Sequence, residues 1–270
     1  MKITCKELAQ EVKDNVRLKI SGTGFVPRFL IVSVGDDPAS ASYVRGKIRD
    51  CEEVGIKVFH LKLDADCTQE NLEYVLTTYG YETDAVILQL PLPKHLDADR
   101  AIECIPLEKD VDGLRLGSYY KPCTALGIYE LLKRNVDLQG KHAVIINRSK
   151  LVGRPLAKLL LDADATVTVC HSKTRDIAMH TLSADIVVTA VGQPNFLDWN
   201  DVMSGAIVVD VGINRVDGKL CGDYSPTYDE DLYNIEYTPV PGGVGLLTRA
   251  YLMQNVMDAC MRARNIEYVR

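Results

Sequence analysis

Apolar, β-branched runs alternate along the chain with segments in which apolar residues recur at helical spacing. Because strands buried on both faces of a parallel sheet are apolar almost without interruption, these runs predict such strands. The predicted strands occupy residues 28–35, 56–63, 84–93, 141–147, 165–171, 184–192 and 205–212. The predicted helices between them occupy residues 38–54, 68–79, 124–135, 153–163 and 174–182. This strand–helix–strand alternation predicts an α/β fold with crossover helices.

The alternation stops over residues 94–123, a polar and turn-rich stretch with no predicted strand. We place a domain junction there, because 270 residues suit two domains of about 130 residues each. An N-terminal α/β domain is predicted over residues 1–121, and a C-terminal parallel-sheet domain over residues 122–246. A long amphipathic helix, at about 247–270, is expected to pack back on the N-terminal domain, so that the two domains share a cleft.

The composition is that of an ordinary globular protein and limits the kinds of binding partner to expect. Of the residues, 47% are apolar and 25% are charged, and the net charge is −6. Since no block of like charges occurs, we expect neither nucleic acid nor a membrane surface as the main partner. The N-terminus lacks the apolar core of a signal peptide, and no apolar run reaches the ~18 residues of a membrane span. The eight scattered cysteines form no C-x-x-C pair, which favours reduced thiols in a cytoplasmic protein over disulfides or a metal site.

Ligands of open α/β sheets bind at the carboxyl ends of the strands, so the residues just after each strand are informative. After the strand at 141–147, Ser149 can begin a turn and Gly153 permits close backbone approach. Pro155 suits a first helical turn. The N–H groups of this helix start are expected to be free and to form an anion site for a pyrophosphate. The turn is not G-x-G-x-x-G, because position 147 is Asn, and an ordinary strand–helix turn fits the motif equally well.

The next strand is followed by His171, Ser172 and Lys173, with no carboxylate. A site for NAD normally carries an acidic residue at this point, which binds the ribose 2′-hydroxyl. A hydroxyl and a cation in its place, together with Arg148 on the neighbouring loop, favour a 2′-phosphate. The pattern therefore predicts NADP rather than NAD.

Three further loops contain glycine beside the predicted cleft. "AVGQP" (190–194) and "DVGIN" (210–214) each put a glycine after a strand, where a nicotinamide or ribose can approach the backbone. "TPVPGGVGLLT" (238–248) combines two prolines with three glycines ahead of a helix. A stiff turn would explain that loop, but its position predicts a loop shaped for a ligand.

The predicted helix 38–54 carries Ser40, Tyr43 and Lys47 at i, i+3 and i+7, which makes one continuous stripe. A solvated polar face is the alternative. Gln89, which follows a strand in "QLPLP", and Asp112, which lies in "KDVDG" at the junction, are expected to converge with this stripe.

A Tyr-x-x-x-Lys pair also occurs in short-chain dehydrogenases, where it follows the nucleotide-binding turn. Here Tyr43 and Lys47 precede that turn by about a hundred residues, which excludes this class.

The chain resembles the bifunctional methylenetetrahydrofolate dehydrogenase/cyclohydrolase family over essentially its whole length. The resemblance is carried by motifs in order: "PASASYVRGK", "LQLPLP", "KDVDG", "PCT", "RSKLVGRP", "TVTVCHSKT", "ADIVVTAVGQP" and "TPVPGGVG". It implies oxidation of 5,10-methylenetetrahydrofolate by NADP⁺ to the methenyl form, followed by hydrolysis to 10-formyltetrahydrofolate. It also implies a cytoplasmic homodimer that serves one-carbon metabolism and purine biosynthesis, with a Rossmann-like C-terminal domain.

The resemblance also implies roles for individual residues on the substrate side. Lys47 is similar to the family's catalytic lysine, as a base or as an ammonium that stabilises developing oxygen charge. Tyr43 would stack beside the folate ring with Ser40 nearby. Gln89 would orient the lysine, and Asp112 would bind the pterin. The folate side would be completed by Pro241, Gly242 and Gly243.

On the cofactor side, the resemblance implies that Arg148 and Ser172 hold the 2′-phosphate of NADP. The turn with Asn147 and Ser149 would lie near the phosphates. The residues implied beside the nicotinamide are Ile213 and Thr248.

Three places depart from the family's usual pattern. Asn147 replaces a glycine, which is expected to tighten the cofactor turn. Ala125 replaces a proline, and Leu246 and Leu247 replace a Pro-Met pair. Two other readings stay open: an NADP-linked enzyme of the shikimate dehydrogenase type, and a nucleotide-sensing protein in which these departures mark lost catalysis.

Overall fold

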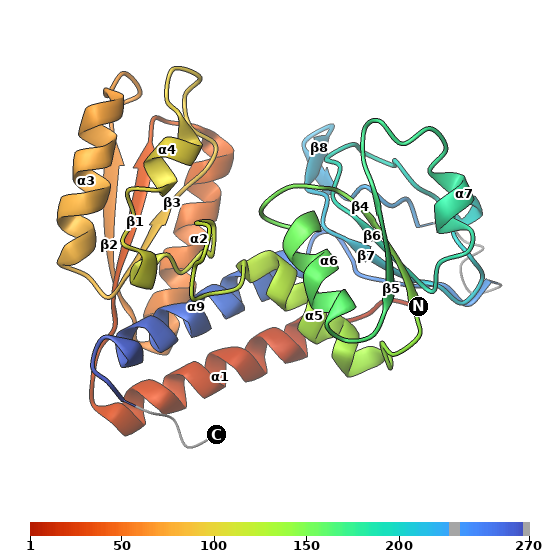
Figure 1. The fold of residues 1–270 in the computed structure, drawn as a ribbon, viewed down its shortest axis with the longest axis horizontal. Helices are drawn as coiled ribbons and strands as arrows, with labels where there is room; N and C mark the ends of the chain where they lie inside the picture. The colour runs from red at the N-terminus through yellow and green to blue at the C-terminus, as the bar shows by residue number, and fades with distance from the viewer. Residues whose placement is uncertain (227–232, 267–270) are drawn as a thin grey trace. The chain divides into compact units, whose positions relative to one another are not determined.

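The computed structural model describes residues 1–226 and 233–266 and divides into two compact units (Figure 1). The N-terminal unit comprises Gln10–Pro122 with Arg249–Arg270, and the C-terminal unit comprises Met1–Ala9 with Cys123–Thr248. Two α/β units agree with the predicted fold class. No helix in the described ranges has the length and apolar character to cross a bilayer.

The first nine residues differ from the predicted boundary, because they belong to the C-terminal unit. Ile3 N donates to Tyr237 O at 2.7 Å, and Tyr237 N donates to Met1 O at 2.9 Å. The N-terminal segment is therefore held beside strand β10 (Glu236–Tyr237) by backbone hydrogen bonds, a pairing between sequence-distant residues.

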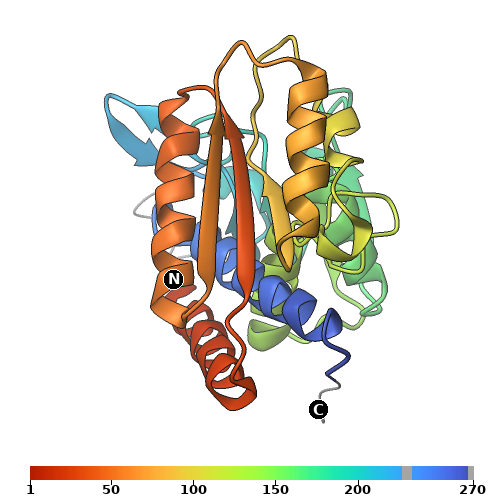
Figure 2. The same ribbon diagram turned by 90° about the vertical axis from the view of Figure 1, so that its left-hand side faces the viewer.

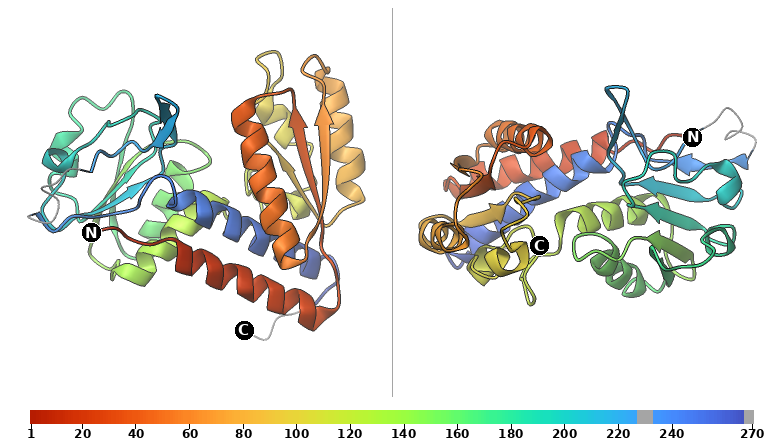
Figure 3. Two further views of the ribbon diagram at one scale, coloured as in Figure 1. Left: turned by 180° about the vertical axis from the view of Figure 1, so that it is seen from behind. Right: turned by 90° about the horizontal axis from the view of Figure 1, so that it is seen from above.

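The N-terminal unit is built on a three-stranded parallel sheet of order β2-β1-β3, with β1 in the centre (Figure 2). Its apolar centre follows from β1, in which six of seven residues are buried. Helices α2 and α3 lie on opposite faces of the sheet (Figure 3). The elements of the sheet and its two covering helices are β1 (Arg28–Val34), α2 (Pro38–Val54), β2 (Lys57–Leu63), α3 (Gln69–Tyr81) and β3 (Ala85–Leu88).

The N-terminal unit contains further helices beyond this layer. The stretch predicted to be strand-free holds two short helices and a single β-bridge between Val86 and Asp110. Helix α1 was not predicted, because charged residues interrupt its sparse apolar positions. These elements are α1 (Lys6–Thr23), α4 (Ala98–Ile102), η1 (Leu107–Lys109) and the helix that returns from the other unit, α9 (Val244–Arg262).

The C-terminal unit contains a five-stranded parallel sheet of order β10-β7-β6-β4-β5. The four predicted strands are present, whereas two-residue β10 and the β8–β9 hairpin are too short and polar to show in the apolar pattern. The sheet's elements are β4 (His142–Ile146), β5 (Thr166–Cys170), β6 (Ile186–Thr189) and β7 (Ile207–Asp210). The other elements are α5 (Cys123–Asn135), α6 (Gly153–Leu161), α7 (Ala178–Thr181), η2 (Trp199–Asp201), β8 (Asn214–Val216) and β9 (Lys219–Cys221).

Candidate functional site

Helix α2 presents the predicted polar stripe because both of its ends are fixed locally. The Asp37 side chain caps its start by accepting a hydrogen bond from Ser40 N at 2.7 Å, and Pro38 occupies the first turn. Gly55 ends the helix in the left-handed conformation, with φ of 93°. Helical geometry between these ends puts Tyr43 and Lys47 one turn apart on one face.

Lys47 is buried with only 7% of its surface exposed, and its amine has a defined partner. Nζ donates to Oε1 of Gln89, the residue that follows β3, at 3.1 Å. The Gln89 amide is itself oriented, because Nε2 donates to Leu90 O at 2.7 Å. Ser40 Oγ lies 3.5 Å from the same carbonyl. The structure therefore brings Ser40, Lys47 and Gln89 together.

Tyr43 lies half-buried on the same helix face. Burial raises the pKa of its phenol, and the positive charge of Arg249 opposes that rise. The phenol is consequently uncharged at neutral pH, which suits a ring that stacks on a flat ligand.

Asp112 lies half-buried in the same unit, in a turn whose backbone is closely fixed. The next residue, Gly113, has φ of 70°, and a Cβ there would stand 2.6 Å from Tyr120 O. From helix α9, Asn255 Nδ2 donates to Val111 O at 2.9 Å. These contacts hold the Asp112 backbone in one position. The convergence of its carboxylate on Lys47 stays a prediction.

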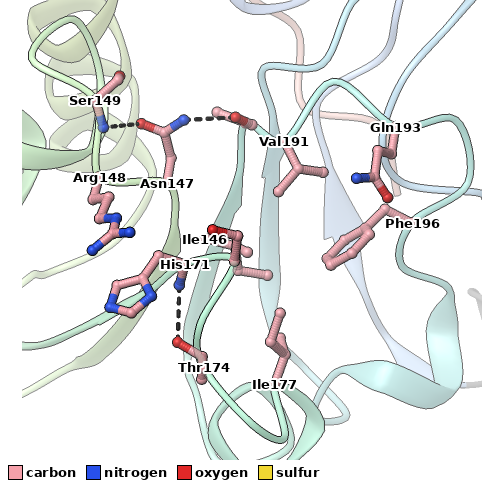
Figure 4. A pocket seen from close by; sticks show the side chains of 12 residues that line it. Ile146, Asn147, Arg148, Ser149, His171, Thr174, Ile177, Val191, Gln193 and Phe196 are labelled. Carbon is pink, nitrogen blue, oxygen red and sulfur yellow. Dashed lines mark hydrogen bonds between the residues drawn. The ribbon is translucent and has the colours of Figure 1, made fainter.

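A pocket of about 470 Å³ opens at the carboxyl ends of β4, β5 and β6 in the C-terminal unit (Figure 4). Four of the predicted cofactor residues line it: Asn147, Arg148, Ser149 and Ser172. Ile213 and Thr248 are not among its lining residues. The other lining residues include His171 and part of the loop 190–194, both of which follow strands and were predicted to lie near the cofactor. The full remaining set is Ile146, His171, Thr174, Ile177, Ala190, Val191, Gln193 and Phe196.

The pocket has a polar side and an apolar side. Arg148 and His171 lie on one side, whereas Val191 and Phe196 lie on the other (Figure 4). His171 Nδ1 accepts a hydrogen bond from Lys173 N at 3.1 Å, which leaves Nε2 as the donor of the neutral ring. All twelve lining residues are described, and none is a carboxylate. The lining thus fits a phosphorylated nucleotide with a flat apolar ring.

The turn between β4 and α6 differs from the prediction of free N–H groups. Asn147 Oδ1 accepts from Ser149 N at 2.8 Å and from Gly153 N at 3.1 Å, while its Nδ2 donates to Ala190 O at 2.7 Å. Val152 N donates to Ser149 Oγ, and Arg154 N to Ser149 O. The Asn147 side chain therefore accepts hydrogen bonds from N–H groups that would be free if position 147 were glycine. A phosphate at this turn would be contacted by side chains instead of by these N–H groups.

The loops after β6 and β7 are tied together by a buried carboxylate that the sequence analysis missed. Asp223 is fully buried. Its Oδ2 accepts from Val191 N at 2.7 Å, and its Oδ1 accepts from Gln193 N at 3.0 Å. Oδ1 also accepts from Asn214 Nδ2 at 2.9 Å. The predicted loops 190–194 and 210–214 are thus joined through one side chain, which no local motif reveals.

A second buried carboxylate, Asp210, makes the stability of the C-terminal unit depend on pH. Burial raises its pKa from 3.8 to about 6, although backbone N–H groups that donate to it oppose the rise. Between these two values the folded state binds more protons than the unfolded state, so the free energy of unfolding falls as pH rises. The fall is expected to approach about 3 kcal/mol across the window.

Asp210→Asn removes this titration. Urea denaturation of both proteins at several pH values between about 4 and 6 is expected to show the wild type losing stability relative to the variant as pH rises. A difference that stays constant across the window would contradict the assignment.

The predicted folate loop and the departures from the family pattern lie in the C-terminal unit. Pro241 is exposed. Gly242 has φ of 98°, and a Cβ on Gly243 would stand 2.3 Å from Pro239 O. The loop therefore requires glycine at both positions. Thr248 Oγ1 lies 3.1 Å from Thr124 Oγ1, and Ile213 is 49% exposed. Three departures are packing positions: Ala125 and Leu247 are fully buried, and Leu246 is half-buried.

Two family descriptions match consecutive parts of the chain. Residues 3–112 match the catalytic domain of tetrahydrofolate dehydrogenase/cyclohydrolase. Residues 122–264 match the NAD(P)-binding domain of the same family. The first contains Lys47 and Gln89, and the second contains the pocket.

Individual relatives agree over nearly the full length. The bifunctional protein FolD of Bacillus velezensis is 42% identical, over 97% of this chain and 96% of its own. The bifunctional methylenetetrahydrofolate dehydrogenase/cyclohydrolase FolD of Campylobacter jejuni superposes with a TM-score of 0.91 at 39% identity, over 97% of this chain and 99% of that one. The Trypanosoma brucei enzyme of the same name, solved with NADP and an inhibitor, gives 0.90 at 32% identity over 98% of each chain.

One of the alternative enzyme types shares only the fold. Shikimate dehydrogenase of Aquifex aeolicus superposes with a TM-score of 0.51 at 10% identity, over 90% of this chain and 94% of that one. Both family descriptions and the full-length relatives instead agree with the motifs around Lys47 and around the nucleotide pocket. The chain belongs to the tetrahydrofolate dehydrogenase/cyclohydrolase family.

Proposed function

We infer that the protein oxidises 5,10-methylenetetrahydrofolate with NADP⁺ and then hydrolyses the product, 5,10-methenyltetrahydrofolate, to 10-formyltetrahydrofolate. The first reaction transfers a hydride from the folate's one-carbon unit to NADP⁺. The second adds water to the resulting cation and releases a proton. The observation that best supports the proposal is the buried Lys47 amine. It lies on the same face of α2 as Tyr43 and donates a hydrogen bond to Gln89.

The N-terminal unit supplies the groups for hydrolysis. Gln89 Oε1 accepts from Lys47 Nζ and so fixes the position of the amine. An amine fixed in this way can move a proton to or from water that attacks the methenyl carbon. Tyr43 offers a ring face for the pterin, and Asp112 offers a carboxylate for its N–H groups. Ser40 Oγ donates to Leu90 O, the carbonyl that also accepts from the Gln89 amide.

The C-terminal unit supplies the cofactor site. NADP⁺ accepts the hydride when it is bound. Arg148, Ser172 and His171 suit its 2′-phosphate, because they line the pocket without a competing carboxylate. Ile177, Val191 and Phe196 suit the adenine ring. We propose that Ile213 and Thr248 lie beside the nicotinamide, and that Pro241, Gly242 and Gly243 lie on the folate side.

Steady-state assays with alternative substrates test the function. The protein is expected to reduce NADP⁺ with 5,10-methylenetetrahydrofolate, much less efficiently NAD⁺, and neither with shikimate. Reduction of NADP⁺ with shikimate alone would identify the other enzyme type. Tight NADP binding without turnover of any substrate would identify a nucleotide sensor.

The assembly and location that accompany this function are part of the proposal. We propose a homodimer formed through the C-terminal unit, acting in the cytoplasm on soluble folates, with neither nucleic acid nor a membrane as partner. Sedimentation equilibrium measures the dimer directly, since a monomer at micromolar concentration would contradict it.

A further inference from the structure

Helix α2 carries a buried carboxylate one turn beyond Lys47. Asp50 has only 6% of its surface exposed and lies at i+3 from the lysine, on the adjoining part of the same helix. Its Oδ2 lies 2.8 Å from Nε of Arg249, the first residue of α9 that belongs to the N-terminal unit. Two further cations approach its other oxygen: Lys13 at 4.0 Å and Arg49 at 3.6 Å.

Gly46 leaves the space that the Arg249 guanidinium fills. A Cβ at this position would stand 2.5 Å from Arg249 Nη1, so the guanidinium would have to shift to admit a side chain. Gly46 adjoins Lys47 in sequence and lies between Tyr43 and Asp50 along α2. A glycine inside a helix is destabilising relative to alanine, so its presence here is explained by the close approach of the guanidinium.

We propose that Arg249 is a positioning residue for the Lys47 site: by pairing with Asp50 across Gly46, it fixes the α2 face that presents Tyr43 and Lys47. The proposal rests on the proposed function. Three observations support it. The pair is largely buried, with side-chain exposures of 20% and 8%. The guanidinium occupies the space that a side chain at Gly46 would fill. Its charge acts on Tyr43.

A second ion pair of the N-terminal unit, made by Arg264 just after the end of α9, provides a matched control. Arg264 Nη1 lies 2.9 Å from Asp84 Oδ1, with side-chain exposures of 28% and 11%. Asp84 precedes β3 and is not part of the Lys47 site. Arg249→Gln and Arg264→Gln each break one partly buried ion pair of the C-terminal segment within the same unit, so a general loss of packing would affect both variants alike.

The first test compares these variants in hydrolysis of 5,10-methenyltetrahydrofolate. Both are expected to lower Tm by similar amounts. Only Arg249→Gln is expected to lower kcat, by roughly 10- to 100-fold, with the Kd for NADP unchanged. Arg249→Lys keeps a cation near Asp50 and is expected to recover part of the lost kcat. Equal kcat values for the two glutamine variants would overturn the proposal.

The second test separates position from stability. Gly46→Ala keeps both charges and adds helix propensity, but its methyl group displaces the guanidinium. It is expected to lower kcat while Tm stays level or rises. Gly22→Ala is the control, because that helical glycine has open space around it and is expected to retain full kcat. A fully active Gly46→Ala would overturn the proposal, whereas an inactive wild type would refute the proposed function instead.

Discussion

Lys47→Met is expected to abolish enzymatic hydrolysis of 5,10-methenyltetrahydrofolate, with a fall in kcat of at least about 100-fold. Methionine keeps an unbranched side chain of similar length in a site that is 7% exposed, so packing should be retained. It removes the amine that donates to Gln89 Oε1. The measurement is the decay of methenyl absorbance at saturating substrate, corrected for the uncatalysed rate.

Lys109→Met is the matched control for that variant. Lys109 Nζ donates to the carbonyls of Gly80, Tyr81 and Thr83, so it stabilises a loop of the same unit. Its replacement is expected to lower Tm and leave kcat near the wild-type value. If Lys47→Met hydrolysed its substrate at the wild-type rate, Lys47 would have no part in the chemistry.

Gly153→Ala is expected to weaken NADP binding by at least about 10-fold, and by 100-fold if the turn opens fully. The added Cβ would stand 1.9 Å from Asn147 O and 2.9 Å from Arg148 N. Both obstacles are backbone atoms, so the turn between β4 and α6 must move as a whole. That turn carries Arg148 and Ser149 into the pocket.

The measurement is a calorimetric titration of each protein with NADP⁺. Gly22→Ala again serves as the control, because its Cβ would meet nothing within 4 Å and its Kd is expected to match the wild type. Lys47-dependent hydrolysis of the methenyl substrate should continue in Gly153→Ala, since that step requires no hydride acceptor. Wild-type affinity in this variant would mean that the turn is not part of the nucleotide site.

Elements with strong local signals were predictable from the sequence. Helix α2 matches its predicted range at both ends, because Asp37, Pro38 and Gly55 are local signals for a start and a stop. Helix α1 was missed, since its charged residues mask buried positions such as Val12 and Val16. Strand β10 has only two residues, and it forms by pairing with β7, which is distant in the sequence. No local pattern therefore predicts it.

The candidate site was predictable wherever a residue follows a strand or shares a helix face. Arg148 and Ser172 line the pocket because each follows a strand. Lys47 lies on the predicted helix face, and its partner Gln89 follows a strand. Asp223 and Arg249 could not be found in this way, because their partners come from distant segments. The occupied N–H groups around Asn147 depend on where its side chain points, which spacing does not specify.

The most direct test of the two proposed activities follows all three folates in one reaction. Wild-type protein is mixed with 5,10-methylenetetrahydrofolate and NADP⁺, and the folates and NADPH are quantified over time by chromatography. We expect 10-formyltetrahydrofolate and NADPH to accumulate in equal amounts, with hydrolysis faster than in the absence of protein. Formation of NADPH with methenyltetrahydrofolate decaying only at its uncatalysed rate would contradict the second activity, and absence of NADPH would contradict the first.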